Sequence, residues 1–327
     1  MPEKLLEVKA LRAAFRIHGK TIEAVRGVDF DIAPGEIVGL VGESGSGKSV
    51  TMKSIIRMLP ESARMSAEIL RFDGCDLTGL TEKQMQGVRG NRISMIFQDP
   101  MTSLNPLRRV GDHIVEVIMR HSAASGAEAY RQAVDMLGMV GVPSPEERMR
   151  QYPHEFSGGM RQRVLIAMAL ASKPKLLIAD EPTTALDVTI QAQILDLIRE
   201  LQEKSGMAVV LITHDLGIVA SLCQRLMVMY GGLILETGAV EDIFYRPMHP
   251  YTRALLRSVP SIDSEDDKRL IPIDGQAPSL IDPPPGCPFA PRCPLRRPSC
   301  EEAIPDFIDY GEGRRARCPV TAGEARP

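Results

Sequence analysis

A short glycine-rich segment between an apolar run and a helical pattern constrains the fold of this chain more than any other feature. Residues 36–41 have the sequence Glu-Ile-Val-Gly-Leu-Val, which suits a buried strand, and residues 48–59 have the pattern of a helix that stops at Pro60. Glycines in the turn let backbone N–H groups converge on phosphate oxygens, and the helix start adds partial positive charge. The segment therefore predicts a strand–loop–helix site for the phosphates of a nucleotide.

We call residues 42–49 the phosphate loop. Lys48 is expected to reach the β- and γ-phosphates, and Ser49 is expected to hold Mg²⁺. With the first residues of the following helix, the expected ATP- and phosphate-binding residues are Gly42, Glu43, Ser44, Gly45, Ser46, Gly47, Lys48, Ser49 and Val50.

An acidic pair after a second apolar run gives a further candidate site. Residues 176–179, Leu-Leu-Ile-Ala, suit a parallel strand that is buried on both faces. Asp180 is expected at its carboxyl end, beside the magnesium, because ligands of open α/β sheets collect at that edge. Glu181 follows directly and is expected to polarise the attacking water as a general base.

A second helix start suited to anions lies farther along the chain. Ser157 is a good N-cap for an apolar helix expected over residues 163–171, and the glycines after it expose backbone N–H groups. Such a helix start binds anions, and it is separate from the phosphate loop. The segment consists of Ser157, Gly158, Gly159, Met160, Arg161 and Gln162.

In this order the motifs resemble the ATP-binding cassette (ABC) family. There the Ser-Gly-Gly helix of one subunit, the signature, caps the γ-phosphate held by the other subunit's phosphate loop. The usual signature is Leu-Ser-Gly-Gly-Gln; here Phe156 replaces Leu and Met160 replaces Gln, while the Ser-Gly-Gly core is intact. The resemblance implies an α/β fold, a P-loop NTPase cassette with a RecA-like core. It also implies an N-terminal antiparallel β subdomain, a helical signature subdomain and a small irregular C-terminal extension.

The same resemblance implies a magnesium site and a catalytic set. Gln98 follows the strand expected over residues 93–97 and corresponds to the glutamine that joins the metal site to the helical subdomain. The implied Mg²⁺ ligands are Ser49, Gln98 and Asp180, and the implied catalytic residues are Glu181, His214 and Gln98.

Three further roles are implied by position. His214 follows the strand expected over residues 209–213 and corresponds to the histidine that contacts the γ-phosphate, although a lone His is more often structural. Phe15 corresponds to the aromatic residue that stacks on adenine, although a single Phe is usually a core residue. The loop that crosses the dimer interface contains Ala185, Leu186 and Asp187.

The chain divides by pattern into a cassette over residues 1–240, with its helical subdomain at about 100–165, and an extension over residues 241–327. Alternating elements over residues 170–240 predict a parallel sheet covered by helices. These elements are Leu176–Asp180, Thr189–Lys204, Ala208–Thr213 and Leu226–Tyr230. Because the sequence has no internal repeat, we expect one cassette in the chain.

Composition narrows the class of protein. The net charge of −3 provides no global basic field for nucleic acid. No apolar run approaches the ~20 residues that span a bilayer, and the charged N-terminus lacks the apolar core of a signal peptide. If the chain serves transport, separate subunits must supply the membrane path.

The stretch His249-Pro-Tyr-Thr-Arg253 resembles a hallmark of the ATPase subunits of peptide and nickel importers. The resemblance implies ATP hydrolysis that energises uptake of dipeptides or oligopeptides; nickel, glutathione and other small solutes stay open as cargo. It implies a second ABC ATPase subunit, most often in a heterodimer with a homodimer open, two transmembrane permease subunits and an extracytoplasmic binding protein. The implied location is peripheral, on the cytoplasmic face of the inner membrane.

The extension holds four of the chain's 6 cysteines, Cys287, Cys293, Cys300 and Cys318. Four thiolates suit a four-iron–four-sulfur cluster or Zn²⁺, but the spacing lacks the Cys-x-x-Cys pair of common zinc sites. Related importer ATPases carry such a cysteine set, and some bind a 4Fe-4S cluster there. The resemblance therefore favours the cluster, with zinc or no metal as the alternatives.

Arginines are frequent near these cysteines, and acidic residues offset them, which predicts a solvated or docking surface. The arginines are Arg292, Arg296, Arg297, Arg314, Arg315 and Arg317.

Three other kinds of ABC protein fit less well. Ribosome-remodelling ABC proteins usually carry two cassettes in one chain, and chromosome or DNA-repair ATPases need a long coiled coil for which 327 residues leave no room. An exporter ATPase is disfavoured by the His-Pro-Tyr region and the cysteine-bearing extension.

Overall fold

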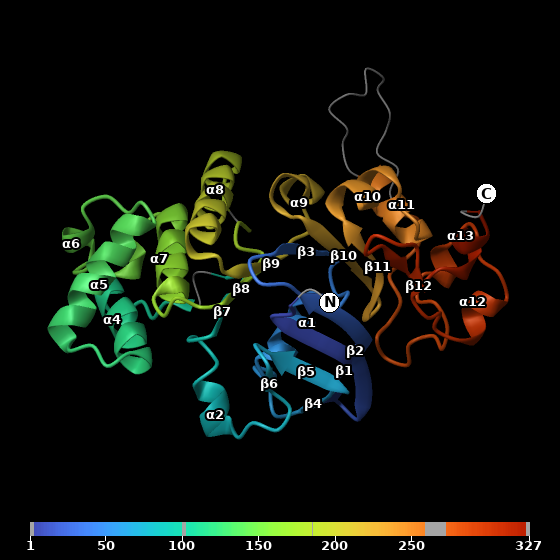
Figure 1. Cartoon of the computed structure of the whole chain (residues 1–327), viewed down its shortest axis with the longest axis horizontal. Helices are drawn as coiled ribbons and strands as arrows, with labels where there is room; N and C mark the ends of the chain where they lie inside the picture. Colours follow the sequence, from blue (N-terminus) through green and yellow to red (C-terminus); the bar gives the residue numbers. More distant parts are fainter. Residues whose placement is uncertain (1–2, 100–102, 185, 259–272, 325–327) are drawn as a thin grey trace, which may run out of the picture. The chain divides into compact units, whose positions relative to one another are not determined.

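The computed structural model describes residues 3–99, 103–184, 186–258 and 273–324. The chain forms two compact units. The first contains residues 1–3, 33–36 and 79–212, and the second contains residues 4–32, 37–78 and 213–327 (Figure 1). The boundary predicted at residue 240 is not tested by this division, because the second unit joins both ends of the chain.

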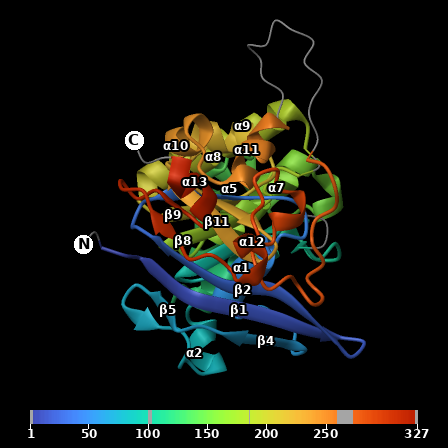
Figure 2. The same cartoon turned by 90° about the vertical axis from the view of Figure 1, so that its right-hand side faces the viewer.

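The second unit opens with an antiparallel β subdomain, as predicted. Its long strands β1 (Leu6–Ile17) and β2 (Lys20–Ile32) pair side by side (Figure 2). The short strands β4 (Ala63–Ser66) and β5 (Ile69–Phe72) pair with β1, and β6 (Cys75–Asp76) pairs with β5. Alternating burial along β1 and β5 places one face of each strand in the core.

A second sheet of this unit supports the phosphate loop. Strand β3 (Ile37–Val41), buried at every residue, runs parallel to β10 (Arg225–Tyr230). Strand β11 (Leu233–Ala239) pairs antiparallel with β10. The extension, expected to be irregular, adds the short strands β12 (Ile308–Asp309) and β13 (Arg315–Ala316) beyond β11.

The helices of the second unit are short. They are α1 (Lys48–Ile55), α9 (Leu216–Leu222), α10 (Val240–Tyr245), α11 (Pro250–Arg257), η2 (Ala290–Arg292), α12 (Ser299–Glu302) and α13 (Pro319–Glu324).

Helix α1 ends before the predicted residue 59. Arg57 has a left-handed φ of 51°, and its N–H donates to the Ser54 carbonyl at 3.0 Å. The Met58 N–H donates to the Lys53 carbonyl at 2.8 Å, which completes a Schellman ending. The prediction missed this end because the left-handed residue is an arginine, which carries no helix-stop signal.

The first unit contains three parallel strands in the order β9 (Ala208–Ile212), β8 (Leu176–Asp180) and β7 (Ile93–Ile96). Residues of β8 and β9 are all buried, which explains their uninterrupted apolar sequences. Its helices, of which α4–α7 form the helical subdomain, are α2 (Glu82–Gln86), α4 (Val110–His121), α5 (Gly126–Met139), α6 (Pro145–Arg148), η1 (Pro153–Glu155), α7 (Gly158–Leu170) and α8 (Val188–Ser205) (Figure 1).

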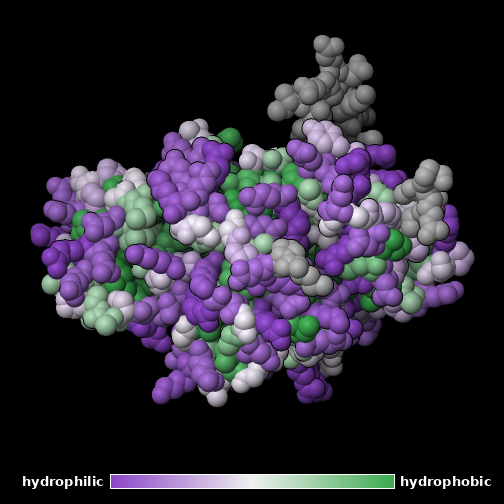
Figure 3. Space-filling model, viewed as in Figure 1, coloured by the Kyte–Doolittle hydropathy of each residue, from purple (hydrophilic) through white to green (hydrophobic). Residues whose placement is uncertain are grey.

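Hydrophilic residues predominate on the face shown in Figure 3, with hydrophobic residues scattered among them. Within the described residues, none of the helices combines the length and apolar character that a membrane span requires.

Candidate functional site

The phosphate loop approaches neighbouring backbone so closely that two of its glycines have no room for a side chain. A Cβ atom on Gly42 would lie 2.0 Å from the Met229 carbonyl oxygen, and one on Gly47 would lie 2.3 Å from that of Ala24. Both glycines also have positive φ, at 150° and 105°. The loop therefore needs glycine at these positions for space as well as for conformation.

Lys48 is the first residue of α1, and its side chain bends back over the phosphate loop. Its ammonium donates hydrogen bonds to the carbonyl oxygens of Gly42 at 2.8 Å and Glu43 at 3.0 Å. The N-cap of α1 is Gly47, which has no side chain to occupy the first-turn N–H groups. Among the described residues, the buried Ser46 hydroxyl has no hydrogen-bond partner. This arrangement of cation, helix start and hydroxyl fits an anionic ligand.

Phe15 and His214 also lie in the second unit. Phe15 is partly exposed on β1, opposite Ile22 of β2. His214 is exposed just before α9, whose first turn is capped by the Asp215 carboxylate. Neither position tests the adenine or γ-phosphate role, so both roles stay predictions.

In the first unit, the structure brings Gln98 and Glu181 together. The Gln98 side-chain amide donates to Glu181 Oε2 at 2.8 Å, and the Thr184 hydroxyl donates to the same oxygen at 2.9 Å. Glu181 has a left-handed φ of 47°, an uncommon conformation for a side-chain-bearing residue that is often found at functional sites. Asp180, 2% exposed, ends β8 directly before it. Thr184 was expected in the interface loop and not as a partner of Glu181, although its place three residues after Glu181 was a signal.

The signature segment has the predicted helix-start geometry. The Ser157 hydroxyl accepts from the Met160 N–H at 3.3 Å and so caps α7. Gly158 and Gly159 are both packed closely: an added Cβ would lie 3.3 Å from Leu186 and 2.6 Å from Ile190.

The side chains after these glycines point in different directions. Arg161 donates to the Pro153 carbonyl at 2.9 Å, and Gln162 is 2% exposed. In the predicted interface loop, the Asp187 carboxylate caps α8. Ala185 lies outside the described residues. The predicted Mg²⁺ ligands divide between the units, with Ser49 in the second and Gln98 and Asp180 in the first, so this site stays a prediction.

The four cysteines of the extension line one cavity of about 20 Å³, together with His249 and Arg317. Burial raises the pKa of the Cys287 thiol to about 11, and it lowers the pKa of His249 to about 3. In the described part of the chain, no group of three or more His, Cys, Asp or Glu side chains is arranged to hold a metal ion. The four cysteines therefore line one cavity, but their side chains are not arranged as a metal-binding site.

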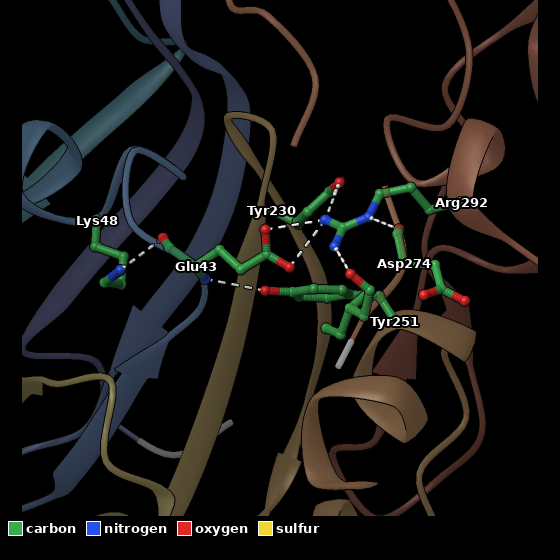
Figure 4. Close-up of polar contacts among 7 residues, drawn as sticks. Glu43, Lys48, Tyr230, Tyr251, Asp274 and Arg292 are labelled. Carbon is green, nitrogen blue, oxygen red and sulfur yellow. Dashed lines mark hydrogen bonds and ion pairs between the residues drawn. The ribbon is translucent and has the colours of Figure 1, made fainter. Parts of the chain in front are cut away.

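The arginines of the extension were predicted to form a solvated or docking surface, but two of them are buried in ion pairs within the chain. The Arg292 side chain is 6% exposed and pairs with Glu43 of the phosphate loop, as Figure 4 shows. The Arg317 side chain is 8% exposed and pairs with Asp29 at 3.2 Å. Neither pair could be predicted from the sequence, because the partners are distant in the sequence.

Comparison with known proteins gives the family. The family model "ABC transporter" matches residues 25–184, and the model "Oligopeptide/dipeptide transporter, C-terminal region" matches residues 235–300. The dipeptide transport ATP-binding protein DppD of Bacillus subtilis is 54% identical over 317 residues, which cover 97% of this chain and 94% of that protein. This chain belongs to the ABC transporter family, and it is an ATPase.

Other similar proteins support the same family assignment. The oligopeptide transport ATP-binding protein OppD of Bacillus subtilis is 55% identical over 289 residues, covering 88% of this ABC ATPase and 80% of the relative. An ATP-binding cassette solved as a dimer in a post-hydrolysis state with ADP and Pi has a TM-score of 0.64 and 27% identity. That alignment covers 72% of this ABC ATPase and 98% of the solved chain, and it confirms the predicted cassette fold.

Proposed function

We propose that this ABC ATPase is the ATP-hydrolysing subunit of a membrane importer of dipeptides or oligopeptides. One observation carries the proposal: the region over residues 235–300, outside the nucleotide motifs, matches the C-terminal region of oligopeptide and dipeptide transporters. Relatives aligned over most of the chain are named as dipeptide or oligopeptide transport ATP-binding proteins, which supports the same cargo class.

Binding of ATP is assigned to the phosphate loop. The Lys48 ammonium now rests on the carbonyls of Gly42 and Glu43, within the loop that would surround the phosphates. Phosphate oxygens are stronger acceptors than these carbonyls, so the ammonium is expected to turn to them when ATP binds. Phe15 would stack on the adenine, and His214 would contact the γ-phosphate.

Hydrolysis is assigned to Glu181. Its Oε2 atom accepts from Gln98 and Thr184, which hold the carboxylate in one orientation. We infer that this carboxylate accepts a proton from the attacking water. Gln98 and Glu181 together would position this water.

The donors of the predicted magnesium site fit the ion in their chemistry. Ser49 offers a hydroxyl oxygen, Gln98 an amide oxygen and Asp180 a carboxylate, all hard oxygen ligands. Bound there, Mg²⁺ would neutralise charge that develops on the phosphates.

The importer would contain further subunits. In a dimer with a second ABC ATPase, most simply a similar chain in a heterodimer, the Ser157–Gln162 segment of this chain would complete the partner's nucleotide site. The partner's signature segment would in turn complete the site at this chain's phosphate loop. The contact between the two subunits would include residues 185–187. Two permease subunits would form the membrane path and receive cargo from an extracytoplasmic binding protein. The chain would then lie on the cytoplasmic face of the inner membrane. Only a difference in ATP affinity between the open and closed dimer can drive such a cycle.

We further propose a 4Fe-4S cluster held by Cys287, Cys293, Cys300 and Cys318. The chemistry of the residues supports this, because all four cysteines line one cavity and because sulfur is the ligand that iron–sulfur clusters use. Burial raises the pKa of Cys287 and of Cys293 and so disfavours their thiolate forms, which a bound cation would stabilise. When bound, such a cluster supplies a covalent link between the distant parts of the extension.

The chain purified without oxygen is expected to contain about four irons and about four acid-labile sulfides, in line with a Cys₄ cluster. The variant Cys300→Ser should lose most of this iron, because the cavity then has three thiols. Cys75→Ser, at a partly exposed cysteine outside the extension, should retain it. Elemental analysis that finds one zinc per chain, or no metal, would contradict the cluster.

The importer proposal is tested on the complex purified from membranes with this chain tagged. Its ATPase activity is compared with an empty binding protein and with the same protein loaded with a dipeptide or an oligopeptide. We expect peptide-dependent stimulation, with two permeases and a second ATPase in the complex. A complex that responds to nickel or glutathione and ignores peptides would overturn the cargo assignment. A chain that purifies without permeases would overturn the importer assignment.

A further inference from the structure

Glu43, the second residue of the phosphate loop, is held by side chains that lie more than 180 residues away in the sequence. Arg292 Nη1 donates to both oxygens of the Glu43 carboxylate, at 3.0 and 2.9 Å. The Arg292 side chain is only 6% exposed, and that of Glu43 is 25% exposed. Figure 4 shows the guanidinium between Glu43 and the extension. An ion pair with so little solvent is screened far less than one on the surface.

Arg292 is itself fixed on every side of its guanidinium. Its Nε donates to the Asp274 carbonyl at 2.8 Å and its Nη2 to the Ile273 carbonyl at 2.7 Å. Nη1 also donates to the Tyr230 hydroxyl at 3.0 Å. Because the planar fork is already committed to these acceptors, little conformational entropy is lost when it holds the carboxylate.

Tyr251 holds the backbone of the same residue. Its hydroxyl accepts from the Glu43 N–H at 3.0 Å, and its ring is fully buried. The ring packs on Tyr230 with centroids 4.4 Å apart and on Phe289 at 5.4 Å. The backbone and the side chain of Glu43 are thus both fixed by residues C-terminal to the cassette motifs.

The position of Glu43 sets the geometry of the phosphate loop. Its carbonyl accepts from the Lys48 ammonium at 3.0 Å and from the Ser46 N–H at 3.2 Å. Its carboxylate also places a negative charge within a loop that must bind phosphates. Left alone, that charge would repel the ligand, so the positive charge of Arg292 has a purpose beyond packing.

We propose that Arg292 is a positioning residue for ATP: it fixes Glu43 and cancels its charge, and so the C-terminal extension sets the ATP affinity of the phosphate loop. The inference rests on the proposed role of residues 42–49 in ATP binding, and it does not depend on the cargo. It assigns to the extension a function within the nucleotide site of its own chain.

The test is the affinity of the full chain for MgATP, measured by equilibrium titration with each variant. Arg292→Ala is expected to weaken binding at least about tenfold, since it leaves a partly buried carboxylate unpaired beside the ligand. Arg292→Lys keeps the charge but loses the planar fork, so its affinity should lie between those of the wild type and Arg292→Ala. Arg296→Ala is the matched control, because Arg296 lies in the same segment and its pair with Glu301 is exposed.

Neutralising the Glu43 carboxylate separates the charge effect of Arg292 from simple packing. Glu43→Gln in the Arg292→Ala background removes the unpaired charge, and we expect it to recover a large part of the lost affinity. Thermal unfolding of each variant shows whether the fold is intact. If Arg292→Ala does not fold, Arg292→Lys alone decides: a wild-type affinity for it would contradict the inference.

The inference would also be overturned if a folded Arg292→Ala chain bound MgATP as the wild type does, or if Glu43→Gln gave no recovery. Failure of the importer proposal appears elsewhere, as missing peptide stimulation in the wild-type complex. The two failures are therefore distinguishable, because one is measured as MgATP affinity of the variants and the other as peptide stimulation of the complex.

Discussion

The variant Glu181→Gln is expected to hydrolyse ATP about 10²- to 10⁴-fold more slowly than the wild type, the usual contribution of a general base. Its affinity for ATP should change little, because glutamine has the same shape and still accepts from Gln98 and Thr184 through its amide oxygen. Bound ATP would then persist, and closed dimers should accumulate. Single-turnover kinetics measure the rate of hydrolysis, and light scattering with ATP measures the accumulation of dimers.

The control for this variant is Glu203→Gln, which makes the same chemical change at an exposed position of α8. Its turnover should equal that of the wild type. If Glu181→Gln also retained wild-type turnover while binding ATP normally, the proton would have to pass to another group, and the assignment of Glu181 as the base would be wrong.

The variant Lys48→Ala is expected to lose ATP affinity roughly 10- to 100-fold, the range for removal of a charge-assisted hydrogen bond. Lys48 is 7% exposed, and its ammonium has its acceptors within the phosphate loop itself. Without the ammonium, the loop carbonyls of Gly42 and Glu43 face the phosphates with no cation between them. Titration of the purified chain with MgATP measures the loss.

Lys9→Ala is the matched control for Lys48→Ala, since Lys9 lies on the N-terminal β subdomain and its ion pair with Glu68 is exposed. It should bind ATP as the wild type does. An unchanged dissociation constant for a folded Lys48→Ala chain would remove Lys48 from the nucleotide site. A loss of turnover at unchanged affinity would instead place its effect in the transition state.

Local signals predicted the elements around the site well. Strand β8 has the predicted bounds, Leu176–Asp180, because a run that is buried on both faces is apolar throughout and ends at its first charged residue. Ser157 caps α7 as expected, because an N-cap depends on one side chain and the next turn. The end of α1 was missed, because a left-handed arginine takes the place of the usual glycine.

Contacts between distant segments could not be predicted from the sequence. Arg292 was placed among the surface arginines, since nothing in its neighbourhood indicates an acidic partner 249 residues earlier. The four cysteines, grouped by their place near the end of the sequence, do line one cavity, but the buried His249 beside them was not expected. Arg292 and Glu43 meet because the chain returns to the second unit at residue 213, and a sequence pattern does not encode that return.

The edge of the sheet at β11 gives the extension one more role. Glu236 and Thr237 pair with Ala316 and Arg315 of β13, and the Arg317 N–H donates to the Leu235 carbonyl at 2.8 Å. A chain cut after residue 240 would keep every nucleotide motif and yet expose this edge, where apolar side chains and unpaired backbone groups invite other chains to add on. The extension is thus a cover for the cassette, and the end of the motifs in the sequence is not the end of the folding unit.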